Sequence, residues 1–116
     1  MRHRRRGKIL KRKKGPREAM IRSLARAIVL KNSIVTTSAR AKVARSFLER
    51  LISKEKSGTL ESHRRVILAL GKDAAQRLRR DIVPSLGDRK SGFLRITKQD
   101  IRKSDASSMS RISLVQ

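Results

Sequence analysis

Apolar residues recur at intervals of three and four positions along two stretches in the first half of the chain. Over residues 16–31 they are Met20, Leu24, Ala27 and Ile28, and over residues 38–57 they are Ala41, Ala44, Phe47, Leu48, Leu51 and Ile52. Residues at this spacing share one face of an α-helix, so each stretch is predicted to be a helix with one buried stripe. Gly15 and Pro16 suit the start of the first helix, Asn32 suits its end, and Ser38 is expected to cap the second.

Two shorter helices are predicted in the middle of the chain. One would span residues 60–70 and stop at Gly71. The other would begin at Asp73, which can cap it, and run to Pro84, because proline cannot continue a helix. The inward-facing residues of the two helices would be Leu60, Ile67 and Leu70, then Ala74, Leu78 and Ile82.

After residue 92 the apolar spacing changes from helical to alternating. The alternating apolar residues are Leu94 and Ile96 in one stretch, and Ile112 and Leu114 in another. Alternation indicates strands with one buried face, and residues 100–107 would join the two strands as an antiparallel pair. The β-branched segment Ser33–Thr37 predicts a third strand. Thr36 and Thr37 could place hydroxyls on phosphate or ribose, but the favoured interpretation is a strand end that leads into Ser38.

The predicted fold is therefore α+β, with about four helices packed on a small mixed three-stranded β-sheet. Helices that cover one face of such a sheet bury both sets of apolar residues together. We expect residues 16–116 to form this single domain, preceded by a basic extended arm over residues 1–15.

The charge of the chain indicates a polyanionic partner. The net charge is +23, and the first seventeen residues hold ten Lys or Arg residues before the first acid, Glu18. Residues 51–116 still carry fifteen basic residues against seven acids. A segment as charged as the arm buries too little apolar surface to order itself, so we expect it to be disordered alone and to take one extended path on folded RNA. Each Lys or Arg placed on a phosphate releases a counterion, which favours nucleic acid as the partner.

Residues suited to base stacking, catalysis or metal binding are scarce. Phe47 and Phe93 are the two aromatic residues, so binding should rest on phosphates and RNA shape instead of stacked bases. There is no Cys, and neither His3 nor His63 has a carboxylate at ligand or triad spacing; Glu61, two residues from His63, points to another side of a helix. We expect no enzyme activity, no metal, no cofactor and no small-molecule substrate.

Three other classes of basic protein were weighed. An architectural nucleoid-type DNA-binding protein is the main alternative, although the arm lacks an apolar wedge at its tip. A membrane-active cationic protein needs an apolar helix face that the arm lacks, and an RNA-modifying enzyme needs a catalytic constellation. No apolar run reaches the eighteen residues of a membrane span, and no signal or transit peptide is evident, so no membrane contact and a cytoplasmic location are expected.

Several short motifs, taken together, resemble one known family. They are Arg2-His3-Arg4, Arg17 before Ala19-Met20, Ile34-x-Thr36-Thr37, Ala41-Lys42 with Arg45, Glu49, Leu51 and Ile52, Gly92-Phe93-Leu94-Arg95-Ile96, Asp105-Ala106 and Ile112-x-Leu114. In combination and spacing they resemble ribosomal protein seventeen of the bacterial large subunit, over essentially the whole chain. The chain departs from the family pattern at Lys14-Gly15-Pro16-Arg17, at Lys31-Asn32, and at Phe93, where tyrosine is usual.

The resemblance implies a structural ribosomal protein, with its arm in 23S rRNA and its globular part on the subunit surface near the polypeptide exit. Its partners would be 23S ribosomal RNA and neighbouring large-subunit ribosomal proteins. Carried over by position, the RNA-binding residues would be Arg2, His3, Arg4, Arg5, Arg6, Lys8, Lys11, Arg12, Lys13, Lys14, Arg17, Arg22 and Lys42.

Overall fold

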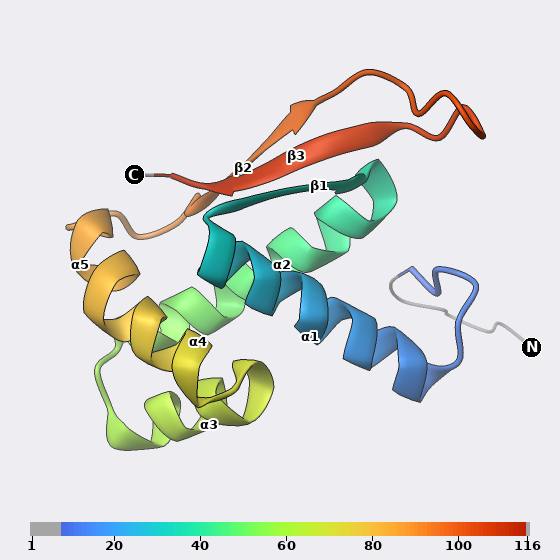
Figure 1. The fold of residues 1–116 in the computed structure, drawn as a ribbon. Helices are drawn as coiled ribbons and strands as arrows, with labels where there is room; N and C mark the ends of the chain where they lie inside the picture. Colours follow the sequence, from blue (N-terminus) through green and yellow to red (C-terminus); the bar gives the residue numbers. More distant parts are fainter. Residues whose placement is uncertain (1–7, 116) are drawn as a thin grey trace, which may run out of the picture.

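Two long helices lie beneath a small sheet in the computed structural model of the chain, which describes residues 8–115 (Figure 1). The long helices are α1 (Lys14–Lys31) and α2 (Ser38–Lys56), followed by α3 (Leu60–Leu70), α4 (Lys72–Arg77), a π-helical turn η1 (Leu78–Ile82) and α5 (Val83–Leu86). The strands are β1 (Ser33–Thr37), β2 (Leu94–Lys98) and β3 (Met109–Leu114). The predicted α+β fold is confirmed, with β2 and β3 where the alternation placed them and β1 at the β-branched segment.

The last strand along the chain is the middle strand of the sheet, whose order is β1-β3-β2. Both pairings are antiparallel, and Ile112 faces Ile34 on one side and Ile96 on the other. β1 and β2 therefore run in the same direction without touching, and the sheet is antiparallel instead of mixed. These three isoleucines lie on the face of the sheet toward the helices, where they form part of the core.

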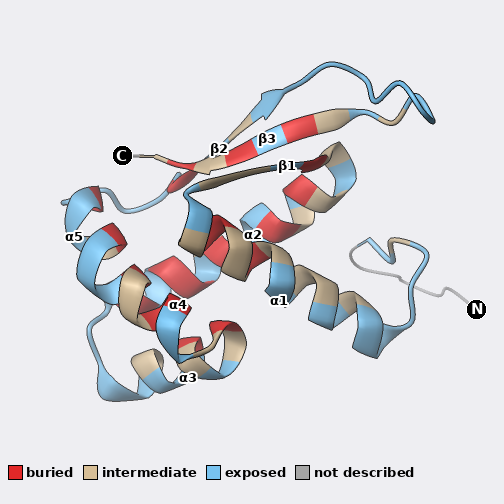
Figure 2. Cartoon of the chain, in the orientation of Figure 1, coloured by how far each residue is buried: buried red, intermediate tan, exposed pale blue. Residues whose placement is uncertain are grey.

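The core lies between the sheet and the helices, and it differs from the predicted stripes on α1, α2 and α3 (Figure 2). Leu60 of α3, predicted to face inward, is 61% exposed. α1 buries Ala25, Ile28 and Val29, whereas Leu24 is half-buried at the edge of the core. Leu48 of α2 is fully buried, while its neighbour Phe47 is half-buried. The core face of α1 is thus rotated toward Ala25, because the small alanine lets α1 approach its neighbours closely.

The helix starts also differ from the predictions. α1 begins at Lys14 after Lys13, so Pro16 is its third residue. Proline is tolerated there because the first N–H groups of a helix have no partner within it. Ser38 does not cap α2; its hydroxyl bonds Ser108 Oγ at 2.9 Å and Ser110 Oγ at 2.7 Å, which ties α2 to the end of β3.

The predicted fourth helix continues beyond Pro84 as α4, η1 and α5 in succession. Since Pro84 has no N–H, a regular helix would leave a carbonyl unpaired, and the wider π-helical turn before it absorbs the mismatch. Asp73 lies within the first turn of α4 and is paired with Arg26, so it is not the cap. Gly71, the predicted stop of α3, has a φ of +91°.

Residues 8–13, the described part of the predicted arm, include a tight turn. Leu10 and Lys11 both have positive φ, 55° and 54°, and the Arg12 N–H donates to the Ile9 carbonyl at 3.2 Å. The remaining arm predictions fall on residues 1–7, outside the described part of the chain. Over the described residues, no helix is long and apolar enough to cross a membrane.

Candidate nucleic-acid interface

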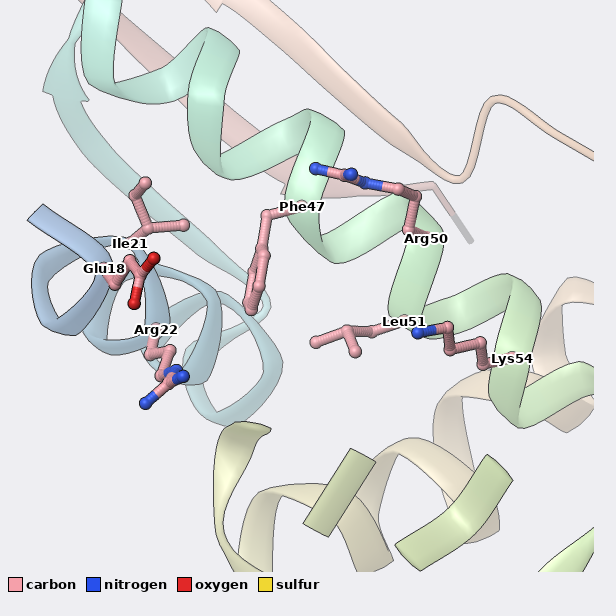
Figure 3. Close-up of a pocket in the computed structure, with 7 residues that line it drawn as sticks. All are labelled: Glu18, Ile21, Arg22, Phe47, Arg50, Leu51 and Lys54. Atoms are coloured by element: carbon pink, nitrogen blue, oxygen red, sulfur yellow. The ribbon is translucent and has the colours of Figure 1, made fainter. Parts of the chain in front are cut away.

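A cleft of about 370 Å³ runs between α1 and α2 (Figure 3). Phe47 of α2 projects toward α1 and forms the floor together with Ile21 and Leu51. The rim is polar and largely basic, because the core-facing stripes of the two helices leave their charged faces on either side. The rim residues are Glu18 and Arg22 from α1, and Arg50 and Lys54 from α2.

Two further hollows extend this cleft along α2. One, of about 350 Å³, lies between the turn at residues 8–13 and the start of α2, and it brings Lys8 together with Lys42. The other, of about 510 Å³, lies between α2 and the segment that carries Ser91 and Phe93. Arg50 lines each of these three hollows. Together we call these three hollows the α2 groove.

A loop anchored by Lys56 forms the far wall of the α2 groove. The Lys56 ammonium donates to the Gly87 carbonyl at 3.1 Å and to the Arg89 carbonyl, and it lies 5.4 Å from the centroid of the Phe93 ring. These contacts engage the Lys56 ammonium within the protein and stabilise the loop. The exposed side chains of Arg89 and Lys90 remain on this loop at the edge of the groove.

The cations of the α2 groove have no carboxylate partners. Within residues 8–115, no carboxylate oxygen lies within 4.0 Å of the charged nitrogens of Lys8, Arg22, Lys42, Arg50 or Lys54. The Nε of Arg50 donates to the Ser46 carbonyl at 3.2 Å, which lays the guanidinium along the helix surface and leaves its other nitrogens outward. Unpaired cations along a hollow are suited to a chain of phosphates, since each can approach a separate anion.

The structure brings three of the predicted site residues to this groove: Lys8, Arg22 and Lys42. The other described ones lie apart from it, exposed around the turn and the start of α1: Lys11, Arg12, Lys13 and Lys14. Arg17 is half-buried, and its Nη1 donates to the Arg12 carbonyl at 3.4 Å. Five predicted residues lie outside the described part of the chain: Arg2, His3, Arg4, Arg5 and Arg6.

Sequence reasoning had not included Arg50 and Lys54 in the interface. Both follow Lys42 at intervals of four, through Ser46, and so lie on the same side of α2. The four-residue interval from Lys42 therefore indicates Arg50 and Lys54 from the sequence. The short Ser46 side chain keeps the groove open between the two long cations.

His63 has a carboxylate partner, contrary to the sequence expectation. Its Nδ1 lies 2.9 Å and 3.0 Å from the two oxygens of Glu55, whose side chain is 2% exposed. Because an ionised carboxylate can only accept, Nδ1 carries the hydrogen. Arg79 Nε lies 3.8 Å from the same carboxylate. The pair joins the end of α2 to α3 across a short turn, which is why spacing along the chain did not reveal it.

This buried pair has the character of a structural contact. Within the described residues, no group of three or more His, Cys, Asp or Glu side chains could hold a metal ion. Glu55 is enclosed by the turn between α2 and α3, away from the α2 groove. The arrangement therefore stabilises the corner between the two helices.

Comparison with known proteins shows the family of the chain. The family model described as ribosomal protein L17 matches residues 20–115. The large ribosomal subunit protein bL17 of Gemmatimonas aurantiaca is 38% identical over 99% of this chain and 98% of its own length. The bL17 proteins of Campylobacter lari and Wolinella succinogenes are 38% and 37% identical, each over 99% of this chain and at least 99% of their own length.

Proposed function

Because the chain belongs to the ribosomal protein L17 family, we propose that it is a structural constituent of the large ribosomal subunit and binds folded 23S rRNA through phosphate contacts. The observation that carries this proposal is the α2 groove, in which Arg50 connects three hollows and the cations have no carboxylate partners among residues 8–115. The basic arm leads into the same groove at Lys8.

The groove is suited to the RNA backbone more than to bases. Its two rings are Phe47, half-buried between α1 and α2, and the buried Phe93, so neither offers an open face for stacking. Lys42, Arg50 and Lys54 follow one another along α2, which allows successive phosphates of one strand to meet successive cations. Recognition would then depend on the shape of the folded RNA.

The proposed setting follows from the same role. The protein would work in the cytoplasm as part of the ribosome, beside neighbouring large-subunit proteins, and without catalytic activity. Residues 2–14, which end at the first residue of α1, would contact rRNA together with Arg17, Arg22 and Lys42, to which we add Arg50 and Lys54. The net charge of +23 favours a polyanionic partner, whose phosphates these residues would neutralise.

The experiment is a salt titration of binding to protein-free large-subunit rRNA. The double variant Arg50→Gln/Lys54→Gln should bind more weakly, and the slope of log K against log salt should flatten by about 1.4 to 1.8 for two lost phosphate contacts. The control is Arg64→Gln/Arg80→Gln, which removes the same charge from exposed positions on α3 and η1. Equal slopes for the two double variants would contradict the groove as the binding surface.

Sedimentation separates the ribosomal role from the DNA-binding alternative. In a sucrose gradient of a cell lysate, the protein should migrate with the large subunit after DNase treatment. Loss of co-migration after DNase would favour the nucleoid-type protein instead.

A further inference from the structure

One face of the sheet is bare. The helices pack against the face that holds Ile34, Leu94 and Ile112, and among residues 8–115 no element covers the opposite face (Figure 1). Figure 2 shows the resulting alternation of buried and exposed residues along β3. The outer face consists of Ser33, Val35, Thr37, Arg95, Thr97, Met109, Arg111 and Ser113.

The outer face is basic and rich in hydroxyl groups. The three strands contain no Asp or Glu, and the register places Arg111 between Val35 and Thr97 in the middle of the face. Arg95 stands opposite Ser113 on the edge strand, one row away from Arg111. Side chains on diagonal neighbours such as these lie about 7–8 Å apart at Cβ, so the two guanidiniums share one patch.

Some arginines of the domain pair with carboxylates, and Arg95 and Arg111 do not. Arg26, Arg65 and Arg102 each pair with a carboxylate, at 2.5 to 2.8 Å. Over the described residues, neither Arg95 nor Arg111 has a carboxylate oxygen within 4.0 Å. The Nη1 of Arg111 donates at 3.4 Å to Ser33 Oγ, which spreads the side chain across the face and leaves its charge uncompensated.

We propose that the outer face of the sheet is a second RNA-binding surface, which contacts the sugar–phosphate backbone of an RNA segment beyond the one in the α2 groove. This inference rests on the proposed ribosomal function. Two guanidiniums suit phosphates, and the hydroxyls of Ser33, Thr97 and Ser113 can bond phosphate oxygens and ribose 2′-hydroxyls.

The composition of the face favours RNA over a protein partner. Protein interfaces are enriched in aromatic residues, Met and Arg. Here Arg111 occupies the centre with no aromatic residue on the three strands beside it, and the apolar side chains of the face are Val35, which is 47% exposed, and Met109 at one end. No aromatic ring lies on the three strands, so the contact would follow the backbone and not stack on bases. The protein would thus join two RNA segments, one on the helices and one on the sheet.

The first test extends the salt titration on protein-free large-subunit rRNA. Arg95→Gln/Arg111→Gln should flatten the slope of log K against log salt by about 1.4 to 1.8, more than the control Arg64→Gln/Arg80→Gln. If the groove variant flattens the slope and the sheet variant matches the control, the second surface is wrong and the proposed function stands. If the wild-type protein does not bind the rRNA, the proposed function itself fails.

The second test identifies what lies on the face in the assembled subunit. Because the chain has no cysteine, Thr97→Cys introduces a single thiol on the outer face, to which a photo-crosslinking group can be attached before assembly. Crosslinking to rRNA, at a site different from that reached from Ser53→Cys in the α2 groove, supports the inference. Crosslinking to a ribosomal protein or to a second copy of this chain overturns it, and so does the absence of any crosslink.

Discussion

Arg26 of α1 and Asp73 of α4 form a two-point ion pair, with Nη1 2.6 Å from Oδ1 and Nη2 2.5 Å from Oδ2. The same Nη1 also donates to the Leu70 carbonyl at 2.7 Å, at the end of α3. One arginine therefore fixes α1 to the corner between α3 and α4. The corner is closed by Gly71, where a Cβ atom would lie 2.6 Å from Arg26 Nη1.

Gly71→Ala should destabilise the domain. The φ of +91° is unfavourable for alanine, and the new methyl group would push Arg26 away from its two partners. We expect a loss of about 1–3 kcal/mol in the free energy of unfolding, measured by chemical denaturation. Gly15→Ala is the control, because no heavy atom lies within 4 Å of its added Cβ in the first turn of α1. Equal midpoints for the two variants would contradict the model of this corner.

The Arg26–Asp73 pair should make the free energy of unfolding depend on pH in the acidic range. The hydrogen bond from Arg26, followed by that from the Ala74 backbone, lowers the pKa of Asp73 below its usual value. A lowered folded-state pKa gives stability that is present above the unfolded pKa of about 3.9 and is lost as the pH falls through the folded value. The difference in unfolding free energy between wild type and Asp73→Asn should therefore shrink from pH 6 to pH 2. Asp81→Asn, an exposed control, should show a smaller change over that range.

Leu48 and Leu24 should differ in their contribution to the core. Leu48 is 0% exposed, whereas Leu24 is half-buried at the edge. Leu48→Ala should lower the unfolding free energy by about 2–5 kcal/mol, and Leu24→Ala should cost less because its site can be filled by solvent. Urea denaturation measures both unfolding free energies, and a Leu24→Ala variant less stable than Leu48→Ala would contradict the assigned core.

His63→Ala should destabilise the protein through the carboxylate that it leaves behind. Glu55 would remain buried, with Arg79 at 3.8 Å as its nearest cation among the described residues. The expected loss is about 1–3 kcal/mol in unfolding free energy at pH 7. The double variant Glu55→Gln/His63→Ala should recover part of this loss, because no buried charge remains. A double variant less stable than His63→Ala would contradict the buried charge of Glu55 as the cause of the loss.

Removal of residues 2–14 should weaken RNA binding and its salt dependence together. These residues include nine Lys or Arg side chains, and Lys8 among them lines the α2 groove. If roughly half of them contact phosphates, log K against log salt should flatten by about 3 to 4. The measurement uses the same rRNA as the groove variants, and an unchanged slope would show that the arm does not contribute.

Local patterns in the sequence were sufficient for the elements but not for the exact face that each helix buries. Alternation located β2 and β3, and helical spacing located α1 and α2. On α1, however, the stripes that begin at Leu24 and at Ala25 are adjacent and both apolar. Packing against neighbouring elements selected the second, and this choice is absent from the spacing of one helix.

The functional surface was predictable where it followed one helix and not where it depended on contacts between elements. Lys42 predicts Arg50 by helical periodicity, and composition predicts an anion-binding surface. The pairing of His63 with Glu55 depends on how the turn between α2 and α3 folds back, and Ser38 meets Ser110 across 72 positions. Such contacts follow from tertiary structure, which determines whether a polar side chain caps, pairs or binds.

The central position of β3 has a consequence for synthesis of the protein. β1 and β2 pair with β3 and not with each other, and β3 is the last of the three to be translated. A nascent chain that ends before residue 109 therefore holds two strands without partners, while the basic arm has already been made. Sheet formation must follow translation of residues 109–114, and a premature stop codon before them removes the pairing partner of both other strands.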